Sequence, residues 1–591
     1  MALPIRRLLC LGDRRFMRLR LRSIVLVVLV VVVGTTLFTS FDISKRSNPQ
    51  PRVSTPGLVV ARNGAVSSEN GICSEIGVEV LKDGGSAVDA AVATGFCIGV
   101  TNSYSSGIGG GGFMVVRQPN GNSSFLDFRE QAPGAATEDM FTQDPKLAQV
   151  GGLAVGVPGE PMGYHEAHRR YGKLPWKRLV QPAADLCIEG WTVSPLLAQR
   201  IATAEPWLLK DPAFSAVFAP NGTGLKEGQH IKRVTLGKTL QIIADEGVDS
   251  FYRGSIAHSL VKTVQGAGGI LTLEDLANYR VHVNETVVGY YHGRKVITGP
   301  PPSSGAVFIT IMNILEGYDL RGEGLTLLNY HRIIEAFKYA YAQRGFYGDP
   351  ADAVFSNITS IMHKFIDKDL AAAYRHNTSD DHTFNDIQHY QPEYYIKDNH
   401  GTMHVSVLTA DGSAVSLTST VNLIFGARLM DPETGIILND EMDDFSIPGV
   451  SNAFGLAPSP YNFIKPGKRM TSSSVPAIIE RDGEVELVVG ASGGSMIPTA
   501  SMWTTLCTLE FGMDPLEALR LPRIHHQLFP NLASLEYSVD PAIERSLISR
   551  GHNVTRLAPS AFTGVSVVKK LKDGTIQAAA DPRKGGLAAG Y

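Results

Sequence analysis

The chain has 591 residues, of which 43% are hydrophobic and 19% are charged, so it is neither a disordered nor a collagen-like chain. At roughly 150 residues per domain, this length predicts three to four domains. The formal net charge of −3 argues against a nucleic-acid-binding protein. The charge is unevenly spread, because residues 1–23 hold seven arginines and one acid, whereas the remainder carries a net charge of −9.

An uncharged stretch of 18 residues follows the basic arm, at residues 24–41. As a helix it would span about 27 Å, close to the hydrocarbon thickness of a thin bilayer. The alternative is a cleaved signal peptide, but such apolar regions are shorter and end in small residues, whereas this one ends in Thr35, Thr36, Leu37 and Phe38. We therefore expect a single uncleaved transmembrane helix.

The arginines orient this anchor. Positive residues stay on the cytoplasmic side, so residues 1–23 are predicted to be a cytoplasmic arm and residues 42–591 to lie outside the cell or in an organelle lumen, such as a vacuole. Residues 42–56 are polar with three prolines, which is typical of a stalk. Six candidate glycosylation acceptors all lie beyond the anchor: Asn122, Asn221, Asn284, Asn357, Asn377 and Asn553.

Of the five cysteines, only Cys10 lies in the cytoplasmic arm. The chain has no CxxC pair, so the cysteines beyond the anchor predict a disulfide or buried thiols and no zinc site; they are Cys73, Cys97, Cys187 and Cys507.

Strands and helices alternate beyond the stalk without a second linker, which favours one large α/β unit over a string of modules. The hairpin among them turns at Asp411-Gly412. In chain order the predicted elements are a buried helix at residues 86–100, the two strands of the hairpin at residues 404–409 and 413–419, a strand at residues 484–489 and a helix at residues 498–511.

The glycine-rich run at residues 107–112, GIGGGG, matches the GxGxxG pattern of dinucleotide-binding loops. That fingerprint requires a following helix, but residues 113–117, FMVVR, predict a strand. We reject dinucleotide binding and expect a bare backbone against which another segment packs.

A second motif, GASGG at residues 490–494, fits the GxSxG nucleophile elbow with Ser492 as nucleophile. A predicted strand precedes it, a predicted helix follows it, and Asp514, His525, His526 and His552 come later in the chain. A serine hydrolase is therefore one hypothesis. In the competing interpretation the turn acts through its backbone N–H groups, which could hold an oxyanion, and a plain tight turn is the third.

Gly401-Thr402 stands directly before the alternating strand. Threonine is a common strand former, so the pair alone is unremarkable. A chain cut between Gly401 and Thr402 would make the Thr402 hydroxyl a nucleophile with its own α-amino group as general base.

The sequence around Thr402 resembles the γ-glutamyltransferase (glutathione hydrolase) family. The resemblance rests on residues 401–407, 411–422 and 439–445, and extends from about residue 57 to residue 591 through GGSAVDAAVAT at 84–94, GIGGGGF at 107–113, YGKLPW at 171–176, GPPPSSG at 299–305 and DPRKGG at 581–586.

This resemblance implies an N-terminal-nucleophile (Ntn) hydrolase fold, a four-layer αββα sandwich made as a precursor. Self-cleavage after Gly401 would give a heavy chain, with residues 57–401 in the domain, and a light chain of residues 402–591. The two chains would remain together.

The resemblance also assigns a binding site for a γ-glutamyl group. A guanidinium and hydroxyls suit its α-carboxylate, and acceptors suit its α-ammonium. Without the family resemblance, Arg129 would be interpreted as a surface arginine and the acids as a solvated loop or a weak cation site. The implied set is Arg129, Ser472 and Ser473 for the carboxylate, Asn422, Glu441 and Asp444 for the ammonium, Thr420 beside the nucleophile, and Gly494 against the substrate.

The implied reaction is a two-step acyl transfer. Thr402 attacks the γ-carbonyl while the N–H groups of Gly493 and Gly494 hold the oxyanion, and the γ-glutamyl ester then passes to water or to an amino acid or dipeptide. Glutathione and other γ-glutamyl compounds are the implied substrates, with no cofactor and no metal. An inactive membrane-bound relative is the remaining alternative, and the complete residue set argues against it.

By resemblance, Cys73 and Cys97 form the family's first disulfide. A second pair found in vertebrate members is missing, because Ser215 and Ala219 stand there. A fungal or other eukaryotic member is therefore as consistent with the sequence as a vertebrate one.

Overall fold

The computed structural model describes residues 57–396, 401–449, 451–453 and 455–591. The predicted arm, anchor and stalk, residues 1–56, lie outside the described residues. None of the described helices combines the length and the apolar composition that crossing a bilayer requires. Beyond Ser54 the chain forms one unit, in place of the three to four domains predicted from length.

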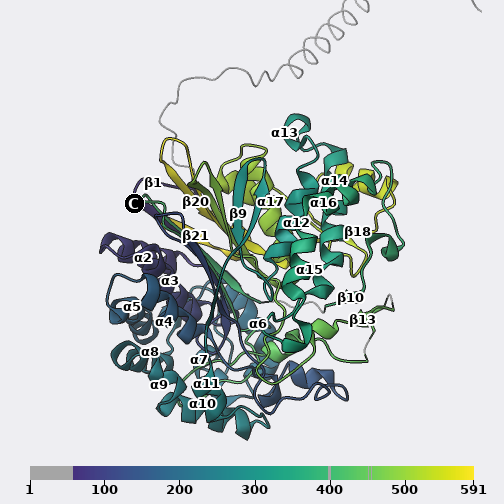
Figure 1. The fold of residues 1–591 in the computed structure, drawn as a ribbon. Coiled ribbons are helices and arrows are strands. Elements are labelled where there is room, and N and C mark those ends of the chain that lie inside the picture. Colours follow the sequence, from purple (N-terminus) through teal and green to yellow (C-terminus); the bar gives the residue numbers. More distant parts are fainter. Residues whose placement is uncertain (1–56, 397–400, 450, 454) are drawn as a thin grey trace, which may run out of the picture. The chain divides into compact units, whose positions relative to one another are not determined.

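Two seven-stranded antiparallel sheets face each other at the centre of this unit (Figure 1). The first, here called the hairpin sheet, runs in the order β21 (Leu587–Gly590), β2 (Gly64–Ser68), β11 (Met403–Thr409), β12 (Ala414–Thr420), β3 (Gly111–Arg117), β4 (Ser123–Phe128) and β7 (His282–Asn284). The second, the β15 sheet, runs in the order β1 (Val59–Ala61), β20 (Ile576–Ala580), β19 (Gly564–Lys570), β15 (Glu484–Ser492), β14 (Ala477–Arg481), β9 (Arg294–Thr298) and β8 (Val287–Tyr291).

Helices cover the outer face of each sheet, and Figure 1 shows the two groups on opposite sides of the strands. The hairpin sheet packs against α2 (Gly71–Lys82), α3 (Ala87–Thr101) and α4 (Glu160–Tyr171). Outside this layer, α5 (Trp176–Glu189) packs on α3, and α8 (Val234–Glu246) packs on α5. The β15 sheet packs against α12 (Gly305–Leu315), α17 (Ile497–Leu509) and α18 (Pro515–Arg520), and α14 (Leu327–Ala342) and α16 (Lys368–His376) pack on the outside against α12. A smaller apolar core fills the space between the sheets.

The predicted hairpin is present as β11 and β12, and its alternating pattern has a physical cause. Met403 and Val405 point into the core shared with the helices of the hairpin sheet. Polar residues of the two strands face the other sheet, where Ser406 Oγ donates to the Ser566 carbonyl at 3.0 Å and Ser416 Oγ donates to the Val489 carbonyl at 3.1 Å. The polar face is therefore buried between the sheets and joins them.

The other predicted elements are also found. The helix expected at residues 86–100 is α3, whose residues are all buried and whose first turn is held by a capping box between Ser86 and Asp89. The expected strands at residues 113–117 and 484–489 lie within β3 and β15, and the expected helix at residues 498–511 is α17.

The cysteines and the glycosylation candidates have defined environments. Cys73 in α2 and Cys97 in α3 form a disulfide, whereas Cys187 and Cys507 are buried thiols. Burial raises the pKa of Cys187 to about 12, so this thiol stays protonated and unreactive near neutral pH. All six predicted acceptor asparagines are exposed: Asn122, Asn221, Asn284, Asn357, Asn377 and Asn553.

Candidate functional site

Thr402 immediately precedes β11. Because Met403 pairs with Ser419 in β12, Thr402 lies beside Thr420, at the end of that strand. Its side chain is buried and its φ is 95°, a left-handed conformation that β-branched residues rarely adopt. Such a conformation costs on the order of 1–3 kcal/mol.

Gly401 approaches the backbone that follows Thr420. A Cβ at Gly401 would lie 1.5 Å from the Asn422 carbonyl oxygen, so only glycine fits there. Thr420 Oγ1 accepts a hydrogen bond from the Asn422 N–H at 2.8 Å, and Asn422 Nδ2 donates to the Asp440 carbonyl at 3.1 Å. The predicted cut site is therefore in contact with the segment that leads to the candidate acids.

Arg129, Glu441 and Asp444 form a buried cluster. The guanidinium makes ion pairs through Nη1 with Glu441 and through Nη2 with Asp444. Glu130 Oε2 lies 3.6 Å from Nη1. The expectation of a surface arginine and a solvated acidic loop, drawn without the family, is wrong, since Arg129 and Glu441 are each only 1% exposed.

The charges of this cluster do not balance. One guanidinium faces three carboxyl groups, and burial raises the pKa of Glu130 to about 8 although Arg129 opposes the rise. Burial also raises the pKa of Glu441. For Arg129, burial lowers the pKa, but the acids outweigh it and the pKa rises overall. The surplus of acidic groups makes the site suitable for an additional cationic group such as an ammonium.

The paired serines lie on the segment after Met470, whose carbonyl accepts a hydrogen bond from Arg129 Nε at 3.4 Å. Ser472 Oγ donates to Ser474 Oγ at 3.1 Å, and Ser473 Oγ accepts from Arg344 Nη2 at 2.7 Å. The GPPPSSG motif at residues 299–305 is hydrogen-bonded to this segment.

Ser472 makes two hydrogen bonds with that motif. The Ser472 N–H donates to the Pro302 carbonyl at 2.8 Å, and Ser304 Oγ donates to the Ser472 carbonyl at 2.6 Å.

The glycine turn after β15 lies on the facing sheet. The end of β15 lies against the start of β11, because a Cβ at Gly490 would be 2.2 Å from the His404 ring. Gly493 and Gly494 follow with φ of 127° and 73°, and α17 begins at Ile497. Backbone N–H groups at a helix start attract negative charge, as an oxyanion requires.

Ser492 itself is fully buried between two charged groups. Its hydroxyl donates to Glu69 and accepts from Lys584 Nζ at 2.7 Å. A lysine beside a serine is a known catalytic pairing, but here the serine is 0% exposed and its hydroxyl is held by an acid.

The groups expected to complete a serine triad lie in other contacts. Asp514 caps α18, and His525 lies between Thr499 and Gln527. His552 lies against His331, and His526 accepts from the Leu528 N–H. The structure thus does not favour Ser492 as a nucleophile.

The GIGGGG loop packs against the hairpin, as expected for a backbone without side chains. A Cβ at Gly110 would lie 1.9 Å from the Thr420 carbonyl oxygen, and one at Gly112 would lie 2.2 Å from the Thr418 carbonyl oxygen. This loop therefore fixes the strand end that holds Thr420.

Three groups near the site were not predicted as site residues: Glu69, Glu160 and Lys584. Glu160, at the start of α4, accepts hydrogen bonds from Ser419 and Ser106 behind the hairpin. Lys584 could have been found from the sequence, because it lies in the DPRKGG motif that resembles the family. No motif in the sequence marked Glu69 or Glu160 as site residues.

Comparison with known proteins shows which family this chain resembles over most of its length. Residues 73–591 match the family model described as gamma-glutamyltranspeptidase. Glutathione hydrolase proenzyme 1 of Schizosaccharomyces pombe is 45% identical over 542 residues, 90% of this chain and 85% of that protein. Glutathione hydrolase 2 of Arabidopsis thaliana is 40% identical, over 90% of this chain and 94% of that protein.

Solved structures agree. The cephalosporin acylase of Bacillus halodurans superposes with a TM-score of 0.79 at 26% identity, covering 94% of this chain and 99% of that chain. The gamma-glutamyltranspeptidase of Helicobacter pylori gives a TM-score of 0.53 at 35% identity, covering 58% of this chain and 97% of that chain. The predicted Ntn-hydrolase type of fold is confirmed, and this chain belongs to the gamma-glutamyltranspeptidase family.

Proposed function

We propose that this protein is a self-processing glutathione hydrolase and γ-glutamyltransferase with Thr402 as its nucleophile. The family membership and the 45% identity to a glutathione hydrolase proenzyme support the activity. The observation that carries the assignment of residues is the position of Thr402, beside Thr420 and next to the start of β11, which lies against the end of β15 that leads into the Gly493-Gly494 turn.

Processing follows from the same geometry. The Thr402 hydroxyl attacks the Gly401 carbonyl carbon, the amide bond breaks, and an ester forms while the Thr402 nitrogen gains a proton. Water then hydrolyses the ester, leaving a carboxylate on Gly401 and a free α-amine on Thr402. The left-handed φ of Thr402 favours this cut, because cleavage removes that torsion altogether.

The comparisons support two polypeptides in the mature enzyme. Nearly all of the H. pylori chain is matched, yet it covers only 58% of this chain, as a heavy chain alone would. The word proenzyme in the name of the S. pombe relative agrees with this.

The buried ion cluster suits an α-amino acid. The substrate α-carboxylate would pair with the Arg129 guanidinium, and its α-ammonium would replace that cation as the partner of Glu441 and Asp444. Ser472, Ser473 and Asn422 would supply further hydrogen bonds. Binding then exchanges one set of ion pairs for another, so no charge is left buried without a partner.

The catalytic cycle passes through a γ-glutamyl ester on Thr402. The free α-amine takes the hydroxyl proton as the oxygen attacks the γ-carbonyl, and the Gly493 and Gly494 N–H groups stabilise the oxyanion. Collapse of this intermediate expels cysteinylglycine from glutathione, taking the proton from the α-amine. Water or an acceptor amine then removes the acyl group.

We also propose a membrane-anchored protein with its catalytic unit outside the cytoplasm. The arginine-flanked apolar stretch at residues 24–41 and the six exposed acceptor asparagines support this topology.

A denaturing gel with N-terminal sequencing tests the processing. Wild-type protein should give two fragments, the smaller beginning at Thr402, and should release the chromophore from a γ-glutamyl anilide. Thr402→Ala should remain one chain without activity, and Thr402→Ser, which keeps a hydroxyl, should be processed. A Thr402→Ala variant that is cut and active would refute the proposal.

The serine alternative is tested by Ser492→Ala. We expect this variant to be processed and to keep its turnover within a few-fold, because removing this hydroxyl leaves Glu69 and Lys584 to pair directly. Loss of all turnover in a processed, folded Ser492→Ala protein, together with fluorophosphonate labelling of wild-type Ser492, would favour the serine mechanism.

A further inference from the structure

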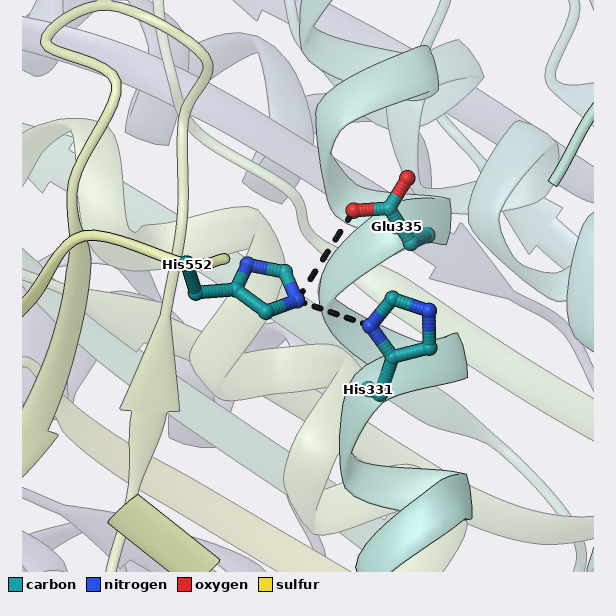
Figure 2. A group of neighbouring side chains, drawn as sticks. All are labelled: His331, Glu335 and His552. Carbon is teal, nitrogen blue, oxygen red and sulfur yellow. Dashed lines mark hydrogen bonds and ion pairs between the residues drawn. The ribbon is translucent and has the colours of Figure 1, made fainter. Parts of the chain in front are cut away.

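A second cluster of chemically active side chains lies apart from Thr402. His331 and Glu335 are four residues apart on α14, so they share one face of the helix. His552 comes from the loop that follows α19 (Pro541–Ser549), and Figure 2 shows the three side chains converging. One ligand atom from each lies within 4.8 Å of the others, and all three residues are buried.

The hydrogen bonds fix which atoms could act as ligands. His331 Nε2 lies 2.7 Å from the Ser379 carbonyl, which can only accept, so this nitrogen carries the proton. His331 Nδ1 is therefore the lone-pair nitrogen, and it faces His552 Nε2 at 2.7 Å. A backbone carbonyl that orients a histidine in this way is typical of metal-ligating imidazoles.

Glu335 is also held in place. Thr383 Oγ1 donates to its Oε1 at 2.6 Å and Tyr390 donates to its Oε2 at 2.7 Å. Lys338 Nζ lies 3.4 Å from Oε1 but also donates to Thr383 and to the Phe384 carbonyl, so it does not depend on Glu335 alone. The carboxylate thus keeps its orientation if one oxygen binds a cation.

Two of the three ligand separations bracket the value expected for a small tetrahedral ion. Ligand atoms with bonds of about 2.05 Å lie roughly 3.3 Å apart in a tetrahedral site. His552 Nε2 is 2.7 Å from His331 Nδ1 and 3.9 Å from Glu335 Oε1, values on either side of that spacing. A shift of the His552 ring by roughly 0.6 Å would bring both close to it.

We propose that His331, Glu335 and His552 bind a zinc-class divalent cation, with a water as the fourth ligand. Two imidazoles and a carboxylate are a preferred donor set for Zn²⁺. The sequence had predicted no metal, because the three ligands are not close enough in the chain to form a recognisable motif.

Such an ion would join α14 to the C-terminal part of the chain. If the chain is cut before Thr402, a step that rests on the proposed function, the ion links the heavy chain through His331 and Glu335 to the light chain through His552. Metal binding itself does not depend on the cut, so the two proposals can fail separately.

The test uses the full-length protein in detergent, equilibrated with Zn²⁺ and freed of loose metal by gel filtration. We expect about one zinc per chain by elemental analysis. Substitution with Co²⁺ should give the visible absorption of a four-coordinate site, and Zn²⁺ should raise the Tm. His331→Gln and His552→Gln should each lose the bound metal, whereas His525→Gln, a buried histidine in other contacts, should retain it.

Two results would overturn the proposal. One is wild-type protein that holds no more zinc than the buffer, because the pair is then a simple hydrogen bond between imidazoles. The other is metal retained in both ligand variants. If those variants do not fold, X-ray absorption on the wild-type cobalt protein decides, since the proposal requires two imidazoles and oxygen donors around the ion.

Discussion

At the residue scale, Arg129 pairs with two buried acids, and we propose that it also binds the substrate carboxylate. Arg129→Gln leaves Glu441 and Asp444 without their cation and should cost about 3–5 kcal/mol of stability. Arg129→Lys keeps the charge but loses the two-pronged geometry of the guanidinium. We expect it to fold and to raise KM for a γ-glutamyl anilide about 10- to 100-fold, the equivalent of one lost charge-assisted hydrogen bond.

Arg332→Lys is the matched control, since Arg332 also pairs with two acids, Asp380 and Glu323, on a different part of the fold. Its KM should stay at the wild-type value. A folded Arg129→Lys protein with unchanged KM would show that Arg129 does not bind the substrate.

Glu160 predicts a pH dependence of stability. Burial raises its pKa from the ordinary 4.5 to about 8, against hydrogen bonds from Ser419 and Ser106. Between these two values the folded protein holds a proton that the unfolded chain releases, so the stability that Glu160 provides is full below pH 4.5 and is lost as the pH rises towards 8. The loss is on the order of 4 kcal/mol.

Glu160→Gln removes this titration, so its free energy of unfolding should fall less steeply than that of the wild type across this window. Chemical denaturation at a series of pH values measures the difference. Parallel curves for the two proteins would mean that Glu160 is ionised in the fold.

At this scale, the roles of the binding residues were predicted through family resemblance. Arg129 and the acids stand 312 and 315 residues apart, so no local pattern could indicate that they are buried together. Thr402 was chemically interpretable from its position before a strand, but its left-handed φ depends on the contact of Gly401 with Asn422.

At the scale of elements, the glycine loop before β3 determines where β12 ends. Gly110→Ala would place a methyl group 1.9 Å from the Thr420 carbonyl oxygen, so the strand end must move. We expect a stability loss of about 1–3 kcal/mol and processing slowed at least about tenfold, because Thr420 lies beside Thr402 and a shift of one displaces the other. A gel time course of precursor cleavage and thermal unfolding measure both.

Gly266→Ala is the control for this experiment. Gly266 ends α10 (Ser255–Gly266), and a Cβ there meets nothing within 4 Å. Its stability should be unchanged or about 0.5–1 kcal/mol higher. Normal processing in Gly110→Ala would show that the contact between Gly110 and Thr420 does not determine the position of Thr402.

The sequence predicted local elements well and their partners poorly. Alternation identified β11 and β12, and the unbroken apolar run identified α3. Neither pattern reveals that β2 inserts beside β11, where Ser68 pairs with Val405. Strand order depends on contacts between distant segments, which a periodicity in one segment cannot encode.

At the scale of the whole molecule, the strands on either side of the proposed cut are interleaved. In the hairpin sheet, β2 lies between β21 and β11, and β3 pairs with β12. In the β15 sheet, β1 pairs with β20 and β9 pairs with β14. Within these two sheets, five strand pairings therefore join the two proposed chains, and a cut before Thr402 breaks none of them.

Wild-type protein should consequently elute as one species in gel filtration, although a denaturing gel separates fragments of 401 and 190 residues. After denaturation the two chains must find each other, so the refolding yield should rise with protein concentration below the range where aggregation sets in. The uncut Thr402→Ala chain keeps all strands on one polypeptide, and its yield should not depend on concentration in that range. Fragments that separate without denaturant would contradict the interleaved arrangement, since parting them requires every one of those pairings to open.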